Sequence, residues 1–217
     1  MLDSTDDNIS CENGIYGELA GLYWVWKNAT SEYFAFFHYN KYLDIKENKA
    51  IEALNGHYDM IVAKQGTFID HAFPDEYSAF LEEIRKYNSD FFDIYCKVLN
   101  AGGSGHFSGQ NMFIAKREIV DEYCEFLFGL LKHVRTSIGE GQTNPNDKRY
   151  CAYFAERLLT PWLIYRDYTY LEAPLRMMGP WYYQVIRRFK YSRFFRLVPS
   201  RGKAFINRVV RRSSYKS

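Results

Sequence analysis

A short apolar segment, residues 33–37, predicts the strand around which the N-terminal half of the chain is organised. It reads Tyr-Phe-Ala-Phe-Phe, is rich in aromatic residues that favour strands, and stops abruptly at His38-Tyr39-Asn40-Lys41. In open α/β sheets ligands bind where strands end, because loops and helix N-termini meet there. The pattern therefore predicts a buried strand with polar side chains at its C-terminal end. It fits equally a core strand that simply runs into a polar loop.

Apolar residues recur at helical spacing elsewhere and predict helices over residues 15–28, 48–54, 74–87, 89–99, 117–134 and 150–165. Two further strands are predicted over residues 58–63 and 110–115. This alternation of helices and strands favours an α/β fold with parallel strands. Glu18 lies on the same side of the first helix as Leu22, which draws its carboxylate toward the core. Glu156 and Arg157 fall within the last helix, where a solvated charged pair is the default expectation.

The composition narrows the class of protein. With 217 residues, 47% hydrophobic and 25% charged, the chain is long enough for one sizeable core and is neither disordered nor membrane-embedded. The aromatic share of 18% fits sugar-stacking sites, although such rings more often form core. The four cysteines show no CxxC spacing and predict neither a zinc site nor a disulfide framework. Because no signal peptide or long apolar run is present, we expect a cytoplasmic protein.

Charge divides the chain into an acidic body and a basic tail. Residues 173–217 contain 12 of the 28 basic residues and none of the 26 acidic ones. Aromatic and basic residues interleave there, which is typical of segments that lie on anionic membranes. We therefore expect residues 1–172 to form one domain and residues 173–217 to attach it to the inner face of the cell membrane. A disordered solubilising tail is the alternative, and the acidic body argues against a nucleic-acid partner.

Six blocks of residues, in order and spacing, resemble a family of bacterial glycosyltransferases: 6–10, 18–28, 38–42, 111–114, 122–128 and 155–159. The family comes from capsular, exopolysaccharide and O-antigen loci and was long known only as a domain of unknown function. The resemblance implies a GT-A-like, Rossmann-like mixed α/β sheet flanked by helices. It also implies transfer of a sugar from a nucleotide-sugar donor, such as a UDP-hexose, to a lipid-linked glycan.

Two departures from the family pattern affect this expectation. Family members begin with a further strand before the first block, whereas Met1 lies almost on it, so we expect an N-terminally shortened chain. Members read His-Tyr-Arg-Arg-Tyr where this chain has Asn40 and Lys41, which removes bidentate phosphate binding and leaves a point charge. A truncated, non-catalytic protein that acts as an interaction module is therefore the alternative.

Glycosyl transfer needs the leaving diphosphate neutralised and, when the anomeric centre inverts, a base for the acceptor hydroxyl. The resemblance and the strand-end position assign catalytic roles to Glu156 and His38, with Arg157 and Glu18 in acceptor or other contacts. The residues assigned to the donor are Asp6, Asp7, Asn8, Lys27, Tyr39, Asn40, Lys41 and Asn111. No Asp-x-Asp follows the strand, so cationic or His-based handling of the diphosphate is at least as consistent with the sequence as bound Mg²⁺ or Mn²⁺. The residues of any metal site stay unassigned.

Overall fold

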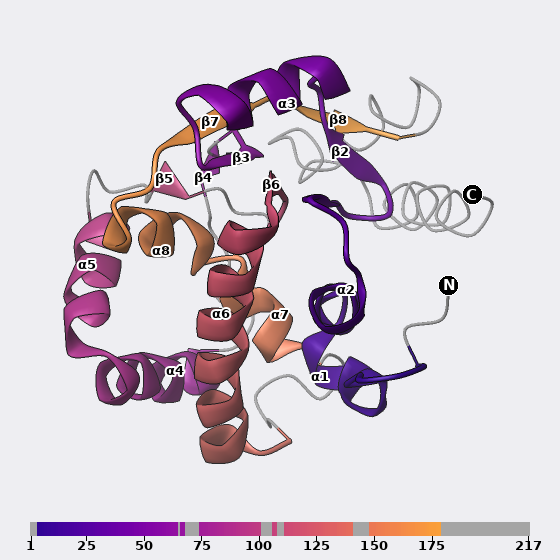
Figure 1. The fold of residues 1–217 in the computed structure, drawn as a ribbon. Coiled ribbons are helices and arrows are strands. Elements are labelled where there is room, and N and C mark those ends of the chain that lie inside the picture. The colour runs from indigo at the N-terminus through magenta and orange to yellow at the C-terminus, as the bar shows by residue number, and fades with distance from the viewer. Residues whose placement is uncertain are drawn as a thin grey trace, which may run out of the picture. The chain divides into compact units, whose positions relative to one another are not determined.

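The computed structural model describes residues 4–64, 66–67, 74–100, 106–107, 111–140 and 148–178 (Figure 1). The chain forms two compact units. The first comprises Met1–His38 and Leu43–Leu175, and the second comprises Tyr39–Tyr42 and Arg176–Ser217. Most of the predicted basic tail, residues 179–217, lies outside the described residues. Of the helices in the described ranges, none combines the length and the apolar character that crossing a membrane requires.

The first unit is built on a mixed four-stranded sheet in the order β1-β6-β3-β7. Its strands are β1 (Tyr33–Phe36), β6 (Phe113–Lys116), β3 (Met60–Ala63) and β7 (Tyr170–Ala173). β6 runs antiparallel to both β1 and β3, and β3 runs parallel to β7. The predicted mixed α/β class is therefore confirmed, but the expectation of parallel neighbours holds only for β3 and β7.

The strand expected to be buried, β1, is instead an edge strand, and its Ala35 is exposed. Its aromatic side chains alternate between the two faces of the sheet, with Phe34 and Phe36 in one core and Tyr33 packed against the other. The fully buried strand is β3, in which all four residues from Met60 to Ala63 are inaccessible to solvent. Its continuous apolar sequence is what burial on both faces requires.

The two faces of the sheet meet different helices. Met60, Val62 and Phe113 belong to the larger core, which the main group of helices completes. Ile61 and Ala63 point to the other face and pack with Leu54 of α3 (Glu47–Gly56). Because successive residues of a strand point to opposite faces, one short apolar strand joins the two cores. The sheet is thus flanked by helices on both faces.

Helix α6 (Arg117–Ile138) is the centre of the helical layer. It packs against α4 (Pro74–Tyr87), α2 (Leu19–Asn28) and α7 (Tyr150–Ala155) (Figure 1). Its buried residues recur every three or four positions, which confirms the predicted amphipathic helix: Ile119, Val120, Tyr123, Cys124, Leu127, Phe128, Leu130, Leu131 and Val134. A second helical contact joins α5 (Ser89–Asn100) to α8 (Leu159–Tyr165).

Short elements complete the described chain. They are the 3₁₀ helix η1 (Ser10–Glu12), α1 (Asn13–Tyr16), β2 (Lys41–Leu43), β4 (Gly66–Thr67), β5 (His106–Phe107) and β8 (Leu175–Met177). β2 pairs with β8, and β4 pairs with β5, in two separate two-stranded sheets. The sequence did not predict β7 or β8. Ala173, the first residue of the expected tail, pairs with Ala63 inside the main sheet.

Two helices predicted to be continuous are each broken in two. Helix α1 ends at Tyr16 and α2 begins at Leu19, because Gly17 has φ +54° and ψ −133°, a conformation that side chains other than glycine rarely adopt. Helix α7 ends at Ala155 and α8 begins at Leu159. Pro161 lies four residues after Arg157, where proline lacks the N–H that would bond the Arg157 carbonyl and its ring would clash with that carbonyl. As a result Glu18 and Glu156 lie at helix ends instead of helix interiors.

Candidate functional site

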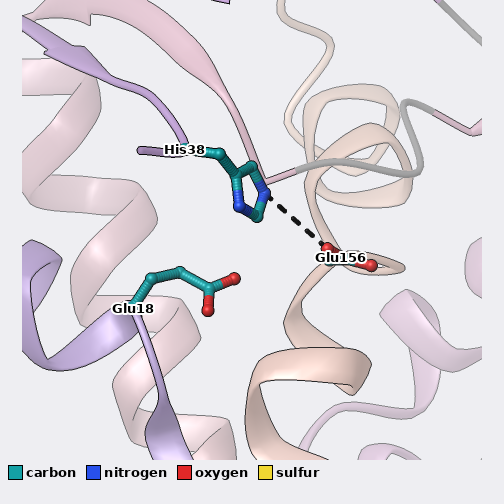
Figure 2. A group of neighbouring side chains, drawn as sticks. All are labelled: Glu18, His38 and Glu156. Carbon is teal, nitrogen blue, oxygen red and sulfur yellow. Dashed lines mark ion pairs between the residues drawn. The ribbon is translucent and has the colours of Figure 1, made fainter. Parts of the chain in front are cut away.

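Three side chains from distant parts of the sequence converge in the first unit: Glu18, His38 and Glu156 (Figure 2). One donor atom from each lies within 4.8 Å of the others. His38 Nε2 is 3.8 Å from Glu156 Oε1, and both side chains are 17% exposed. An imidazole nitrogen and two carboxylate oxygens are donor types that occur in protein metal sites and in proton-transfer sites.

Each member of this cluster is placed by the end of a secondary-structure element. Glu18 follows Gly17 and precedes the first residue of α2. His38 comes two residues after β1 ends, so the predicted polar strand end does deliver its imidazole to the cluster. Glu156 is the C-cap of α7, and its N–H donates to the Ala152 carbonyl at 3.3 Å. Three separate elements thus each contribute one side chain to the site.

Glu156 and Arg157 are not the solvated pair that their expected mid-helix position suggested. Arg157 is only 7% exposed. Its Nη1 donates to the Tyr153 carbonyl at 2.7 Å, and its guanidinium carbon is 5.7 Å from the centroid of the Tyr77 ring. The Tyr77 and Tyr95 hydroxyls are hydrogen-bonded at 3.2 Å. Burial raises the pKa of Tyr95 well above its ordinary value, and the charge of Arg157 opposes that rise. Arg157 therefore ties the α7–α8 turn to the helical core while Glu156 turns to the cluster.

Residues 1–167 match the model of a protein family described as a domain of unknown function, DUF4422. The chain belongs to this family. It is also similar to the apo structure of WbbM, a bifunctional glycosyltransferase, with a TM-score of 0.67 and 22% sequence identity. The similarity covers 82% of this chain and 39% of the WbbM chain, and it shows a shared fold. No curated protein matches the chain significantly.

The first predicted donor-binding block of this DUF4422 chain, Asp6-Asp7-Asn8, forms a loop that anchors α2. Asn8 Nδ2 donates to the Asp6 carbonyl at 2.9 Å, and Asn8 Oδ1 accepts from the Ser10 N–H at 3.1 Å. The Asp7 carbonyl accepts from Asn28 Nδ2 at 2.8 Å, near the end of α2. The Asp6 and Asp7 side chains are exposed. The loop has a clear structural role, and its contact with a donor stays a prediction.

Lys27 and Asn111 lie in contrasting environments, and neither belongs to the cluster. Lys27 is exposed, with Nζ 3.5 Å from the centroid of the Trp26 ring, a cation–π contact. Asn111 is 1% exposed, and its Oδ1 accepts from the Tyr123 hydroxyl at 2.9 Å. Within the described part of the chain, Asn111 Nδ2 has no hydrogen-bond partner. Neither residue is among the three that converge, and the donor contacts predicted for both stay predictions.

The second unit contains three predicted donor-binding residues, Tyr39, Asn40 and Lys41. Tyr39 is 71% exposed. The Asn40 carbonyl accepts from the Met178 N–H at 2.8 Å, and Lys41 begins β2. Their donor-binding role therefore stays a prediction.

The pairing of Glu18 with His38 and Glu156 is what sequence reasoning missed. The sequence predicts Glu18 on the core-facing side of a helix and in acceptor or other contacts, but it does not predict which side chains Glu18 meets. Gly17 directly before Glu18 and Pro161 shortly after Glu156 are local signals for the two helix breaks. They place each glutamate at a helix end, but neither signal shows that the two side chains meet His38.

Proposed function

We propose that this chain is a glycosyltransferase that moves a sugar from a nucleotide-sugar donor, such as a UDP-hexose, to a lipid-linked glycan during capsule, exopolysaccharide or O-antigen synthesis. The observation that supports it is the convergence of Glu18, His38 and Glu156 at the end of β1, in a fold shared with a glycosyltransferase. Acidic and imidazole groups held together in a half-buried site are what group transfer to a hydroxyl uses.

The reaction makes two demands on the site. The acceptor oxygen bonds to the anomeric carbon as the bond from that carbon to the diphosphate breaks, so the hydroxyl proton needs a base when the anomeric centre inverts. The diphosphate leaves with increased negative charge, which needs a cation. Glu156 can accept the proton or help to hold that cation, and His38, 3.8 Å away, can act with it in either role. Arg157 positions Glu156 by fixing the turn between α7 and α8.

The other contacts follow from the sequence. Asp6, Asp7, Asn8, Lys27 and Asn111 are proposed to bind the donor. The sequence assigns the same role to Tyr39, Asn40 and Lys41 of the second unit. The basic aromatic segment 173–217 is proposed to hold the enzyme at an anionic membrane surface, near lipid-linked acceptors. Its support is the residue pattern alone.

The test is transfer by the purified full chain, with a panel of nucleotide sugars and a lipid-linked acceptor analogue, followed by mass spectrometry. We expect product from one donor class. Glu156→Gln should lower kcat about 100-fold or more, since acid–base and electrostatic groups contribute at this scale. The matched control is Glu52→Gln in α3, whose side chain is 69% exposed and pairs with Lys49, and it should retain full activity.

Two results would contradict the proposal. One is a folded wild-type chain that neither transfers nor hydrolyses any nucleotide sugar. The other is a Glu156→Gln variant as active as the Glu52→Gln control, which would remove Glu156 from the chemistry.

A further inference from the structure

We propose that Glu18, His38 and Glu156 together bind one divalent transition-metal cation. The inference deepens the proposed function and rests on it for the purpose of the cation, although binding itself can be measured without any sugar substrate. The three donor atoms lie within 4.8 Å of one another and come from three separate elements (Figure 2).

The charge of the cluster favours a bound cation. Glu18 and Glu156 bring two carboxylates into one half-buried space, where like charges repel more strongly than in water. In the described residues, the Glu18 carboxylate makes no hydrogen bond or ion pair of its own. His38 Nε2 lies 3.8 Å from Glu156 Oε1, within the range of an ion pair. A divalent cation between the three groups would compensate both carboxylates at once.

The geometry allows such an ion after a small movement. Donor atoms that share one ion lie about 3 Å apart when each bond to the metal is about 2.1 Å long. The 3.8 Å spacing of His38 and Glu156 therefore requires closure by about 1 Å, and a pair at the 4.8 Å limit of the group requires closure by about 2 Å. Glu18 and Glu156 lie at helix ends, and a glutamate carboxylate can move by this amount through rotation about its own side-chain bonds, without motion of the backbone. Three protein ligands leave coordination positions open, as in sites that also bind a substrate.

The ligand types indicate the class of metal. One imidazole nitrogen with two carboxylate oxygens suits Mn²⁺ or Zn²⁺. Mg²⁺ prefers oxygen ligands and retains several waters, so an imidazole gives it little advantage. We therefore expect Mn²⁺ to bind more tightly than Mg²⁺, with His38 as the residue responsible for the difference.

The experiment titrates the full chain with Mn²⁺ alone and follows the free ion by electron paramagnetic resonance. We expect one saturable site per chain. Glu18→Gln, His38→Gln and Glu156→Gln should each weaken binding about tenfold or more, whereas Glu52→Gln and His57→Gln, at exposed positions, should not change it. Thermal unfolding without metal checks the fold, and Glu18→Gln should be at least as stable as the wild type because it removes a repelling charge. Mg²⁺ should displace Mn²⁺ only in large excess.

Several outcomes would overturn the inference. They are the absence of saturable Mn²⁺ binding at millimolar concentration, binding by the Glu18→Gln and His38→Gln variants that equals the wild type, and displacement of Mn²⁺ by an equal concentration of Mg²⁺. If Glu156→Gln does not fold, Glu18→Gln still gives the decision, since Glu18 lies before the first turn of α2. Sugar transfer that persists in EDTA without Mn²⁺ binding would refute the metal site and leave the proposed function intact. Mn²⁺ binding by a chain that uses no nucleotide sugar would refute the proposed function and leave the metal site intact.

Discussion

Gly17→Ala is the substitution that tests most directly how the fold places the cluster. Gly17 has φ +54° and ψ −133°, and an alanine held in such a region costs about 1–3 kcal/mol. The added Cβ would also lie 3.3 Å from Ala152 Cβ and 3.5 Å from Arg149 Cδ, so α1 or α7 must shift by a few tenths of an ångström. Alanine also lowers the conformational entropy of the unfolded chain, which stabilises the folded state by about 0.4–1 kcal/mol. The net loss is about 1–2 kcal/mol.

The measurement is thermal and urea unfolding of the full chain, followed by circular dichroism. For a protein of this size each kcal/mol shifts Tm by about 2–4 °C, so Tm should fall by roughly 2–8 °C. The matched control is Gly14→Ala, the same chemical change three residues earlier in α1, where no atom lies within 4 Å of the added Cβ. That variant should gain about 0.5–1 kcal/mol, because alanine favours the helix. Mn²⁺ binding should weaken only in Gly17→Ala, since α7 carries Glu156.

One outcome would refute this reasoning. If Gly17→Ala proves as stable as Gly14→Ala and binds Mn²⁺ like the wild type, the backbone at Gly17 does not hold the two helices in place. The break between α1 and α2 would then have no role in positioning Glu18.

Three further predictions concern stability. Phe80 is fully buried and its ring centroid lies 4.3 Å from that of Phe154 in a stacked pair. Phe80→Ala should therefore lower the free energy of unfolding, measured with urea, by about 3–5 kcal/mol. A loss below about 1 kcal/mol would contradict the packing. Arg157→Ala should lower the free energy of unfolding by about 2–4 kcal/mol, because it removes the hydrogen bond to the α7 backbone and the packed stem of a buried side chain. An unchanged urea midpoint would show that Arg157 is not structural. Burial raises the pKa of Tyr95 and Tyr123, so these phenols ionise at lower pH in the unfolded chain than in the folded one. The free energy of unfolding should therefore fall as the pH rises from about 10 toward the higher pKa values of the folded state. A urea midpoint that stays constant across that range would refute this prediction.

The sequence determined the elements whose signals are local. Helices α4, α5 and α6 were predicted within a few residues of their ends, because an amphipathic spacing is visible within any few turns. The apolar segment of β3 was likewise predicted as a strand. The order and spacing of the sequence blocks also predicted the mixed α/β class and a family known as a domain of unknown function.

Only the tertiary structure decided which strands pair and which side chains meet. The pairing of β1 with β6, and of β3 with β7, depends on packing between segments far apart in the chain, which no local pattern encodes. The helix breaks at Gly17 and before Pro161 follow from local chemistry, but their consequence does not. Glu18 and Glu156 reach His38 because the packed sheet and α6 bring the start of α2 and the ends of β1 and α7 to one place. That convergence is a property of the packed core.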